Sequence, residues 1–152
     1  MTTKELLVNA KASCTCFNEI DTKQKNQVLL DFADALIENT AYIIAENKKD
    51  IDYASDKIAP VMIDRLSLNA ERIKGMAEGI VSVSKLPDPC GEVLSEHETD
   101  GGLKIKKVRV PIGVIAFIYE SRPNVTSDAV ALCFKSSNVC VLRGGKEAIN
   151  TN

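Results

Sequence analysis

Two short polar segments contain the residue types best suited to chemistry. Residues 120–124 read ESRPN, residues 143–146 read RGGK, and each segment follows an apolar run. In the first segment, Pro123 fixes its own φ and restricts Arg122 to extended geometry, which stiffens the loop. Arg122 can bind a carboxylate or a phosphate through two parallel hydrogen bonds, and the Asn124 amide can stabilise an oxyanion. The segment is therefore a candidate substrate-binding loop.

A structural role for the same loop is the alternative. Asn124 is also suited to cap a following helix, and Arg122 to pair with a nearby acid. The residue types alone favour this structural role over a catalytic one.

The second segment has the composition of an anion-binding turn. Its two adjacent glycines let backbone amides approach an anion, and the N-terminus of a following helix would add positive potential. Arg143 and Lys146 add full charges. A simple tight turn into a helix is the alternative, and the two glycines alone favour it over nucleotide binding. The sequence contains no GxGxxG, which disfavours an ordinary Rossmann dehydrogenase.

The elements around these segments predict how they are placed. Residues 112–119 and 139–142 are unbroken apolar runs, and residues 126–135 between them have a helical pattern. This order predicts a right-handed βαβ unit with parallel strands, the first of them buried on both faces. Ligands bind at the carboxyl ends of such strands, where the two polar segments lie, so we expect these two loops to take part in the function.

The sequence before Pro87 predicts helices. A capping box at Thr2 and Glu5 opens one that reaches Phe17, and Asp21 opens a second that runs to residue 53 with a break at 39–40. Asn69 caps a third. The expected buried face of the second helix comprises Val28, Phe32, Ala35, Leu36 and Ile43.

Two further stretches have simpler interpretations. Residues 60–66 are expected to form a connector. Asp64 and Arg65 within it are interpreted either as a surface ion pair or as residues with a functional role, and the sequence leaves both open. Residues 46–50, ENKKD, are expected to be a solvated face.

Residues 92–110 predict a hairpin. Two alternating stretches flank the turn signal at 100–102, DGG, and the adjacent Lys106 and Lys107 shift the alternation by one, as a bulge would. His97, the single histidine, lies in this hairpin and is expected to be structural or solvated.

Composition narrows the class of protein. The chain has 152 residues, a formal net charge of −2, 45% hydrophobic and 26% charged residues, typical of a globular domain with no nucleic-acid or membrane partner. No apolar run reaches the length of a membrane span. Five cysteines (14, 16, 90, 133 and 140) show no metal-binding spacing, so no bound metal is expected. We expect all five to be reduced thiols in a cytoplasmic protein.

The sequence resembles a known family, and the stretches that match it best lie in its second half. The matching stretches are VRVPIGVI at 108–115, IYESRPNVT at 118–126, and LRGG with EAIN at 142–150. They resemble the amino-terminal portion of the gamma-glutamyl phosphate reductase (glutamate-5-semialdehyde dehydrogenase) family, a branch of the aldehyde dehydrogenase superfamily. The resemblance covers the whole chain, more weakly before Asp64.

The resemblance implies an α/β, aldehyde dehydrogenase-like fold in three parts. Residues 1–90 would be the helical part of a cofactor-binding domain, and residues 91–110 a hairpin that crosses to a second copy in a homo-oligomer. Residues 111–152 would begin the NADP-binding βαβ sheet.

The resemblance also implies an activity: NADPH-dependent reduction of gamma-glutamyl phosphate to glutamate-5-semialdehyde in proline biosynthesis. A cysteine thiolate attacks the acyl phosphate and expels phosphate, hydride reduces the resulting thioester, and the aldehyde leaves. Asn124 would hold the oxyanion and Arg122 would bind substrate. The implied cofactor-binding residues are Glu120, Ser121, Arg143, Gly144, Gly145 and Lys146, whose two cations suit the 2′-phosphate of NADP.

The sequence departs from the family in three respects. Ser137 replaces a usual glycine at the end of the crossover helix, Lys146 replaces a small residue, and none of the five cysteines has the setting of an activated nucleophile. We therefore expect this chain alone to be an inactive fragment of the enzyme. The alternative is a non-catalytic nucleotide-binding or oligomerisation module.

Overall fold

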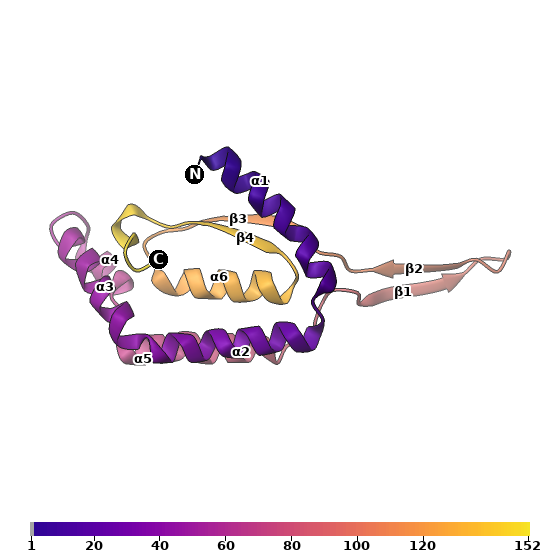
Figure 1. Ribbon diagram of the computed structural model, residues 1–152, viewed down its shortest axis with the longest axis horizontal. Helices are drawn as coiled ribbons and strands as arrows, with labels where there is room; N and C mark the ends of the chain where they lie inside the picture. Colours follow the sequence, from indigo (N-terminus) through magenta and orange to yellow (C-terminus); the bar gives the residue numbers. More distant parts are fainter. Residues whose placement is uncertain (1) are drawn as a thin grey trace.

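The computed structural model describes residues 2–152 and confirms an α/β fold (Figure 1). The helices are α1 (Thr3–Ser13), α2 (Thr22–Glu38), α3 (Thr40–Ala54), α4 (Pro60–Leu66), α5 (Ala70–Ser84) and α6 (Pro123–Lys135), with 3-10 turns η1 (Cys14–Glu19) and η2 (Lys146–Ala148). The strands are β1 (Val93–Glu98), β2 (Lys104–Val108), β3 (Val114–Ile118) and β4 (Val139–Arg143).

The helix starts follow the capping signals. In both predicted capping boxes, at Thr2 and at Asp21, the side chain accepts a backbone N–H and the residue three positions later accepts the cap's own N–H. Asn69 likewise accepts the N–H of Arg72. These starts and the break between α2 and α3 at Asn39 are confirmed, whereas the first predicted helix changes to a 3-10 turn at Cys14.

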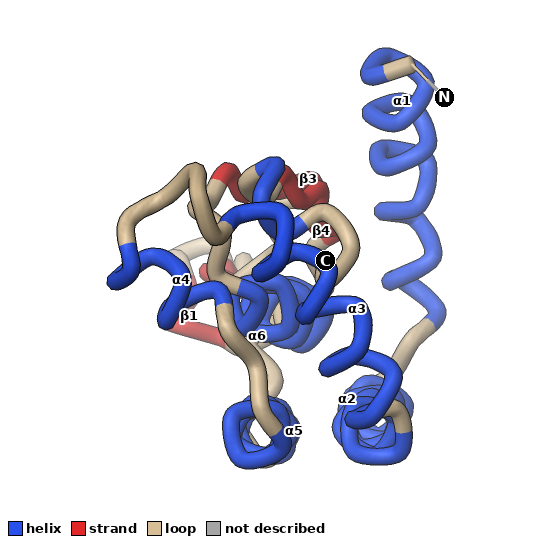
Figure 2. The backbone as a smooth tube through the Cα atoms, turned by 90° about the vertical axis from the view of Figure 1, so that its left-hand side faces the viewer, coloured by secondary structure: helices blue, strands red, loops and turns tan. Residues whose placement is uncertain are grey.

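The main core lies between α2, α5 and α6, which Figure 2 shows nearly end-on with α2 and α5 side by side. It is built from small and branched side chains: Leu29, Ala33, Ala77, Ile80 and Ala131. The predicted face of α2 was therefore partly wrong, because Val28 and Ala35 are exposed. The helix is rotated so that the i, i+4 row of Lys25, Leu29 and Ala33 is buried.

A second core joins α3, α4 and the end of the chain. Leu66 and Ala54 are fully buried there with Ala148. The expectation of a connector at residues 60–66 was wrong: this stretch is α4, which begins at Pro60, where a missing N–H costs nothing. Its last residue, Leu66, supplies the burial that holds so short a helix in place.

The predicted parallel βαβ unit is confirmed. β3 and β4 pair in parallel from Val114 opposite Val139 to Ile118 opposite Arg143, and α6 connects them. The expectation that both faces of the first strand are buried was wrong, since Ile118 is 80% exposed. The reason is that α6 and α1 both pack on β4, whereas β3 packs mainly against β4 itself.

The end of α6 contains the departure at Ser137. This residue has φ +58°, and the Asn138 and Ser137 amides donate to the Cys133 and Phe134 carbonyls. That pattern is a Schellman motif, in which glycine is the favoured residue at the left-handed position. Asn138 is buried, and its side chain accepts the Gly113 N–H at 2.8 Å, which ties the helix end to the start of β3.

The hairpin of β1 and β2 projects from the body, as Figure 1 shows. The hairpin is confirmed, but its bulge is in β1 and not in β2, where it was predicted. Val93 pairs with Val108 and Ser95 pairs with Lys107, so Leu94 is the extra residue. Every residue in both strands is exposed, including His97. No helix among residues 2–152 is long and apolar enough to span a membrane.

Candidate active site

The two predicted loops meet at the carboxyl ends of β3 and β4. The Ser121 hydroxyl donates a hydrogen bond to the Glu147 carboxylate at 2.9 Å. A Cβ on Gly145 would lie 2.1 Å from Ser121 Oγ and 3.1 Å from its backbone nitrogen. Glycine at position 145 therefore permits this approach, and the carboxyl ends of β3 and β4 bring the two loops together.

The adjacent glycine also permits a close contact. A Cβ on Gly144 would lie 2.3 Å from Asn152 Nδ2 and 3.3 Å from the Tyr119 ring. The Tyr119 hydroxyl and Thr126 Oγ1 are 2.6 Å apart, and Thr126 donates to Asn152 Oδ1 at 2.9 Å. Both glycines therefore serve contacts within the protein.

The expectation of a helix after the glycines was wrong. The following element, η2, is a 3-10 turn of three residues, too short to provide a helix macrodipole. Positive charge at this edge comes instead from Arg143 and Lys146, both exposed. The Glu147 backbone N–H and the Ser121 hydroxyl lower the pKa of Glu147, so an ionised carboxylate lies beside these cations.

A buried polar clamp holds the segment after η2. Asp50, 1% exposed, accepts hydrogen bonds from the backbone and side chains of Asn150 and Thr151 at 2.6–3.2 Å. One turn earlier, Asn47 donates to the Leu66 carbonyl. The expectation of a solvated face at residues 46–50 was wrong for these two side chains, because their partners lie far away in the sequence.

Asn124, the expected oxyanion donor, is exposed at the second position of α6. Its Nδ2 lies 3.5 Å from Asp128 Oδ2. Burial raises the pKa of Asp128, and the contact with Asn124 opposes that shift. The alternative that Asn124 caps α6 was wrong, since the cap position is Arg122. The amide is thus not used for capping.

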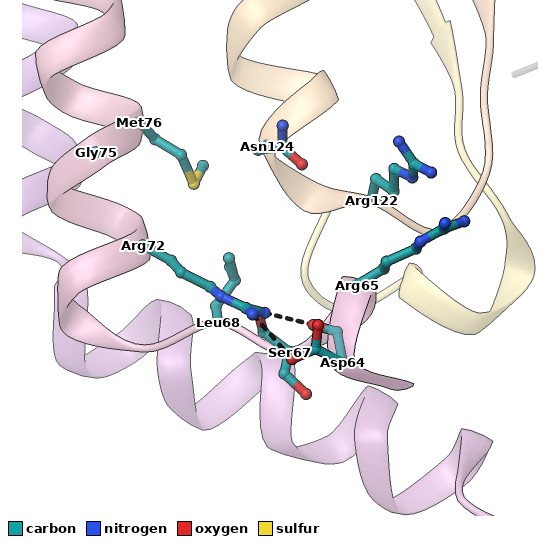
Figure 3. A pocket seen from close by; sticks show the side chains of 9 residues that line it. All are labelled: Asp64, Arg65, Ser67, Leu68, Arg72, Gly75, Met76, Arg122 and Asn124. Carbon is teal, nitrogen blue, oxygen red and sulfur yellow. Dashed lines mark hydrogen bonds and ion pairs between the residues drawn. The ribbon is translucent and has the colours of Figure 1, made fainter. Parts of the chain in front are cut away.

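Asn124 lines a hollow of about 570 Å³ between α4, α5 and the start of α6 (Figure 3). The remaining lining residues are Asp64, Arg65, Ser67, Leu68, Arg72, Gly75, Met76 and Arg122. Asn124 and Arg122 are predicted as site residues from the sequence, whereas Arg65 and Arg72 are not. Their pattern in the sequence is that of ordinary helix-surface arginines, and only the fold brings them to the loop.

The arginines of this hollow differ in how they are held. Arg72 donates to the carbonyls of Asp64 and Ser67 and pairs with Asp64 Oδ1 at 2.9 Å. Arg65 and Arg122 instead share one carboxylate, Glu120, at 4.0 and 3.8 Å. Asp64 therefore pairs with Arg72 and not with its neighbour Arg65.

The cysteines do not form a nucleophilic centre. Burial raises the pKa of Cys133, and burial together with Cys133 raises the pKa of Cys140 to about 12. The thiols of Cys14 and Cys90 donate to the carbonyls of Ala10 and Ser136. Cys16 is exposed on η1, far in sequence from both loops. Among residues 2–152 no cluster of three metal-ligating side chains occurs.

Comparisons with known proteins give a consistent result. No protein-family model matches the chain. Gamma-glutamyl phosphate reductase of Carboxydothermus hydrogenoformans is 51% identical over 148 residues, 97% of this chain and 36% of that protein. The reductase of Clostridium acetobutylicum is 50% identical over 146 residues, 95% of this chain and 35% of that protein. The chain thus spans about a third of the length of these relatives.

Two solved structures share the fold. Gamma-glutamyl phosphate reductase from Thermotoga maritima matches 94% of this chain and 35% of its own, with a TM-score of 0.91 and 38% identity. The enzyme from Saccharomyces cerevisiae matches 99% of this chain and 39% of its own, with a TM-score of 0.93 and 34% identity.

The helices, the projecting hairpin and the βαβ unit thus define an α/β protein of the aldehyde dehydrogenase-like class. Within this class, the chain is a homologue of the amino-terminal portion of the gamma-glutamyl phosphate reductases.

Proposed function

We propose that this chain supplies the amino-terminal portion of a reductase that converts gamma-glutamyl phosphate to glutamate-5-semialdehyde and phosphate in proline biosynthesis. The observation that carries the proposal is the contact between the two loops, Ser121 on Gly145, within a chain about half identical to reductases of that name. Sequence similarity alone would not require the strand-end loops to meet.

The chain's own residues would bind and orient. Asn124 is proposed to donate to the oxygen of the reacting carbonyl, and Arg122 to bind an anionic group of the substrate. Neither role is contradicted by their positions, since both line one hollow beside the strand ends. Glu120 pairs with Arg65 and Arg122 of this hollow, and Ser121 donates a hydrogen bond to Glu147 after β4.

The cofactor we propose is NADP, which supplies hydride when bound. The fit to the residues present is one of charge: Arg143 and Lys146 are exposed cations at the carboxyl end of β4, suited to a 2′-phosphate. Protein atoms occupy the space beside Gly144 and Gly145, so these glycines do not form an open site for a phosphate. Glu147 opposes an additional phosphate, so a modest preference for NADPH over NADH is expected.

We propose that this chain alone has no reductase activity, because burial raises the pKa of Cys133 and Cys140 and none of the five cysteines lies within residues 120–124 or 143–146. Activity would require the thiol of a further segment. The test is to purify the native protein, measure its intact mass against the 152-residue chain, and assay phosphate-dependent oxidation of glutamate-5-semialdehyde. Turnover by the 152-residue chain itself would refute this part of the proposal.

The second candidate function is assembly through residues 91–110. The fully exposed hairpin favours it, because Leu103, Ile105 and Val108 remain open to a partner. We also propose that the chain has three parts, residues 1–90, 91–110 and 111–152, of which the middle part serves assembly. A chain that self-associates without binding nucleotide would be an assembly module.

A further inference from the structure

Arg65 and Arg122 are the two cations of the 570 Å³ hollow whose hydrogen-bonding capacity is least used. The carboxylate that both approach is Glu120, at 4.0 and 3.8 Å, distances longer than the 2.7–2.9 Å of a charge-assisted hydrogen bond, and Arg65 also donates to Met62 Sδ at 3.8 Å. Among residues 2–152, Arg122 Nε is the buried side-chain nitrogen or oxygen that lacks a hydrogen-bond partner. Two guanidiniums therefore approach one site, and the single carboxylate of Glu120 makes a close hydrogen bond to neither.

The surroundings hold this pair in place and leave positive charge in excess. Arg72 is committed to the Asp64 carboxylate and to two carbonyls, and so it fixes the loop between α4 and α5. With Asp64 neutralising Arg72, the single carboxylate of Glu120 faces both Arg65 and Arg122. One positive charge is left over. Figure 3 shows Arg65 extending from α4 toward the loop that carries Arg122.

We propose that Arg65 and Arg122 together bind one anionic oxygen group, a carboxylate or a phosphate, of a small acidic ligand. Two planar guanidiniums match such a group through parallel hydrogen bonds, which one lysine would not provide. Asn124 lines the same hollow, so the ligand's other end would lie toward the proposed oxyanion donor. That the ligand is the glutamyl substrate rests on the proposed function; the anion site itself does not.

The experiment is calorimetric titration of the 152-residue chain at low ionic strength with two probes, glutarate and inorganic phosphate. Saturable binding of at least one probe is expected. Stronger binding of glutarate assigns the site to a carboxylate, and stronger binding of phosphate assigns it to an acyl phosphate. Arg65→Gln and Arg122→Gln should each weaken that binding by about tenfold or more. Arg109→Gln, the same change on the projecting hairpin, should leave it unchanged.

A change in the opposite direction separates binding from folding. Glu120→Gln removes the competing carboxylate and should tighten anion binding several-fold. Arg65 and Glu120 have side chains 44% and 63% exposed, so these variants carry the test even if Arg122→Gln does not fold. The proposal is overturned if neither probe binds, or if Arg65→Gln binds as tightly as the original chain. The titration contains no nucleotide, so its result does not depend on whether the chain binds NADPH. Failure of the anion site can therefore be distinguished from failure of the proposed cofactor binding.

Discussion

Asp50 Oδ2 accepts the backbone N–H of Thr151 at 2.7 Å, across 101 residues of sequence. The same carboxylate accepts hydrogen bonds from the Thr151 hydroxyl at 2.6 Å and from the Asn150 side-chain amide at 2.7 Å. Because Asp50 is buried, these hydrogen bonds fix the segment that follows the β4 loop against α3. One side chain of the helical part thus positions one of the two loops of the candidate active site.

Asp50→Ala should lower the free energy of unfolding by about 3 kcal/mol, because it leaves several buried donors without an acceptor. Urea unfolding followed by circular dichroism measures the change. Asp52→Ala, two residues away, removes an exposed carboxylate paired with Lys48 at 3.6 Å and should cost less than about 0.5 kcal/mol. Equal losses in the two variants would contradict the clamp.

The difference between Asp50 and its neighbours illustrates what sequence could and could not predict. Capping boxes, the DGG turn and the apolar runs are local signals, and each predicted an element that is present. Asp50 and Asn47 are partnered with residues 19 to 104 positions away, so their segment resembled a solvated face. Arg65 joined the site for the same reason: only the packing of α4 brings it to Glu120.

Ser137→Gly should stabilise the chain by about 0.5–1 kcal/mol. Ser137 has φ +58°, which an L-residue adopts at a cost of about 1–2 kcal/mol, partly offset by the entropy that glycine loses on folding. Thermal unfolding should show a higher midpoint. The matched control is Ser136→Gly, at φ −94°, which loses a hydroxyl donor to the Leu132 carbonyl and should lower the midpoint. A lower midpoint for Ser137→Gly would contradict the strain argument.

Stability should fall in acid through Asp88. Burial acts to raise the pKa of Asp88, but hydrogen bonds from Lys25, the Cys90 amide and Thr22 outweigh it and hold that pKa below 3.8. A lowered pKa in the folded state means that the stabilisation is present above about pH 3.8 and is lost as pH falls through the folded-state value.

Asp88→Asn should therefore reduce stability at pH 7 and make it less dependent on pH below 4. Urea unfolding at pH 7 and at pH 3 measures both effects. Asp56→Asn, which keeps the Lys25–Asp88 pair intact, serves as the control and should retain the acid dependence. An unchanged acid dependence in Asp88→Asn would show that other groups determine it.

The hairpin should mediate self-association. Ile105→Glu places a charge on the exposed apolar side of β2 and should shift the chain to a smaller species in sedimentation velocity. Val8→Glu makes the same change at a 59% exposed position on α1 and should leave the distribution unchanged. A monomeric original chain, or equal effects of both variants, would contradict assembly through residues 91–110.

The most direct test of the proposed function is calorimetric titration of the chain with NADPH and NADH. We expect micromolar binding of NADPH, tighter than that of NADH, and at least a tenfold loss of NADPH affinity in Arg143→Gln. Arg109→Gln should bind as the original chain does. If neither nucleotide binds, or if Arg143→Gln binds NADPH unchanged, residues 143–146 do not hold the cofactor and assembly becomes the better account of this chain.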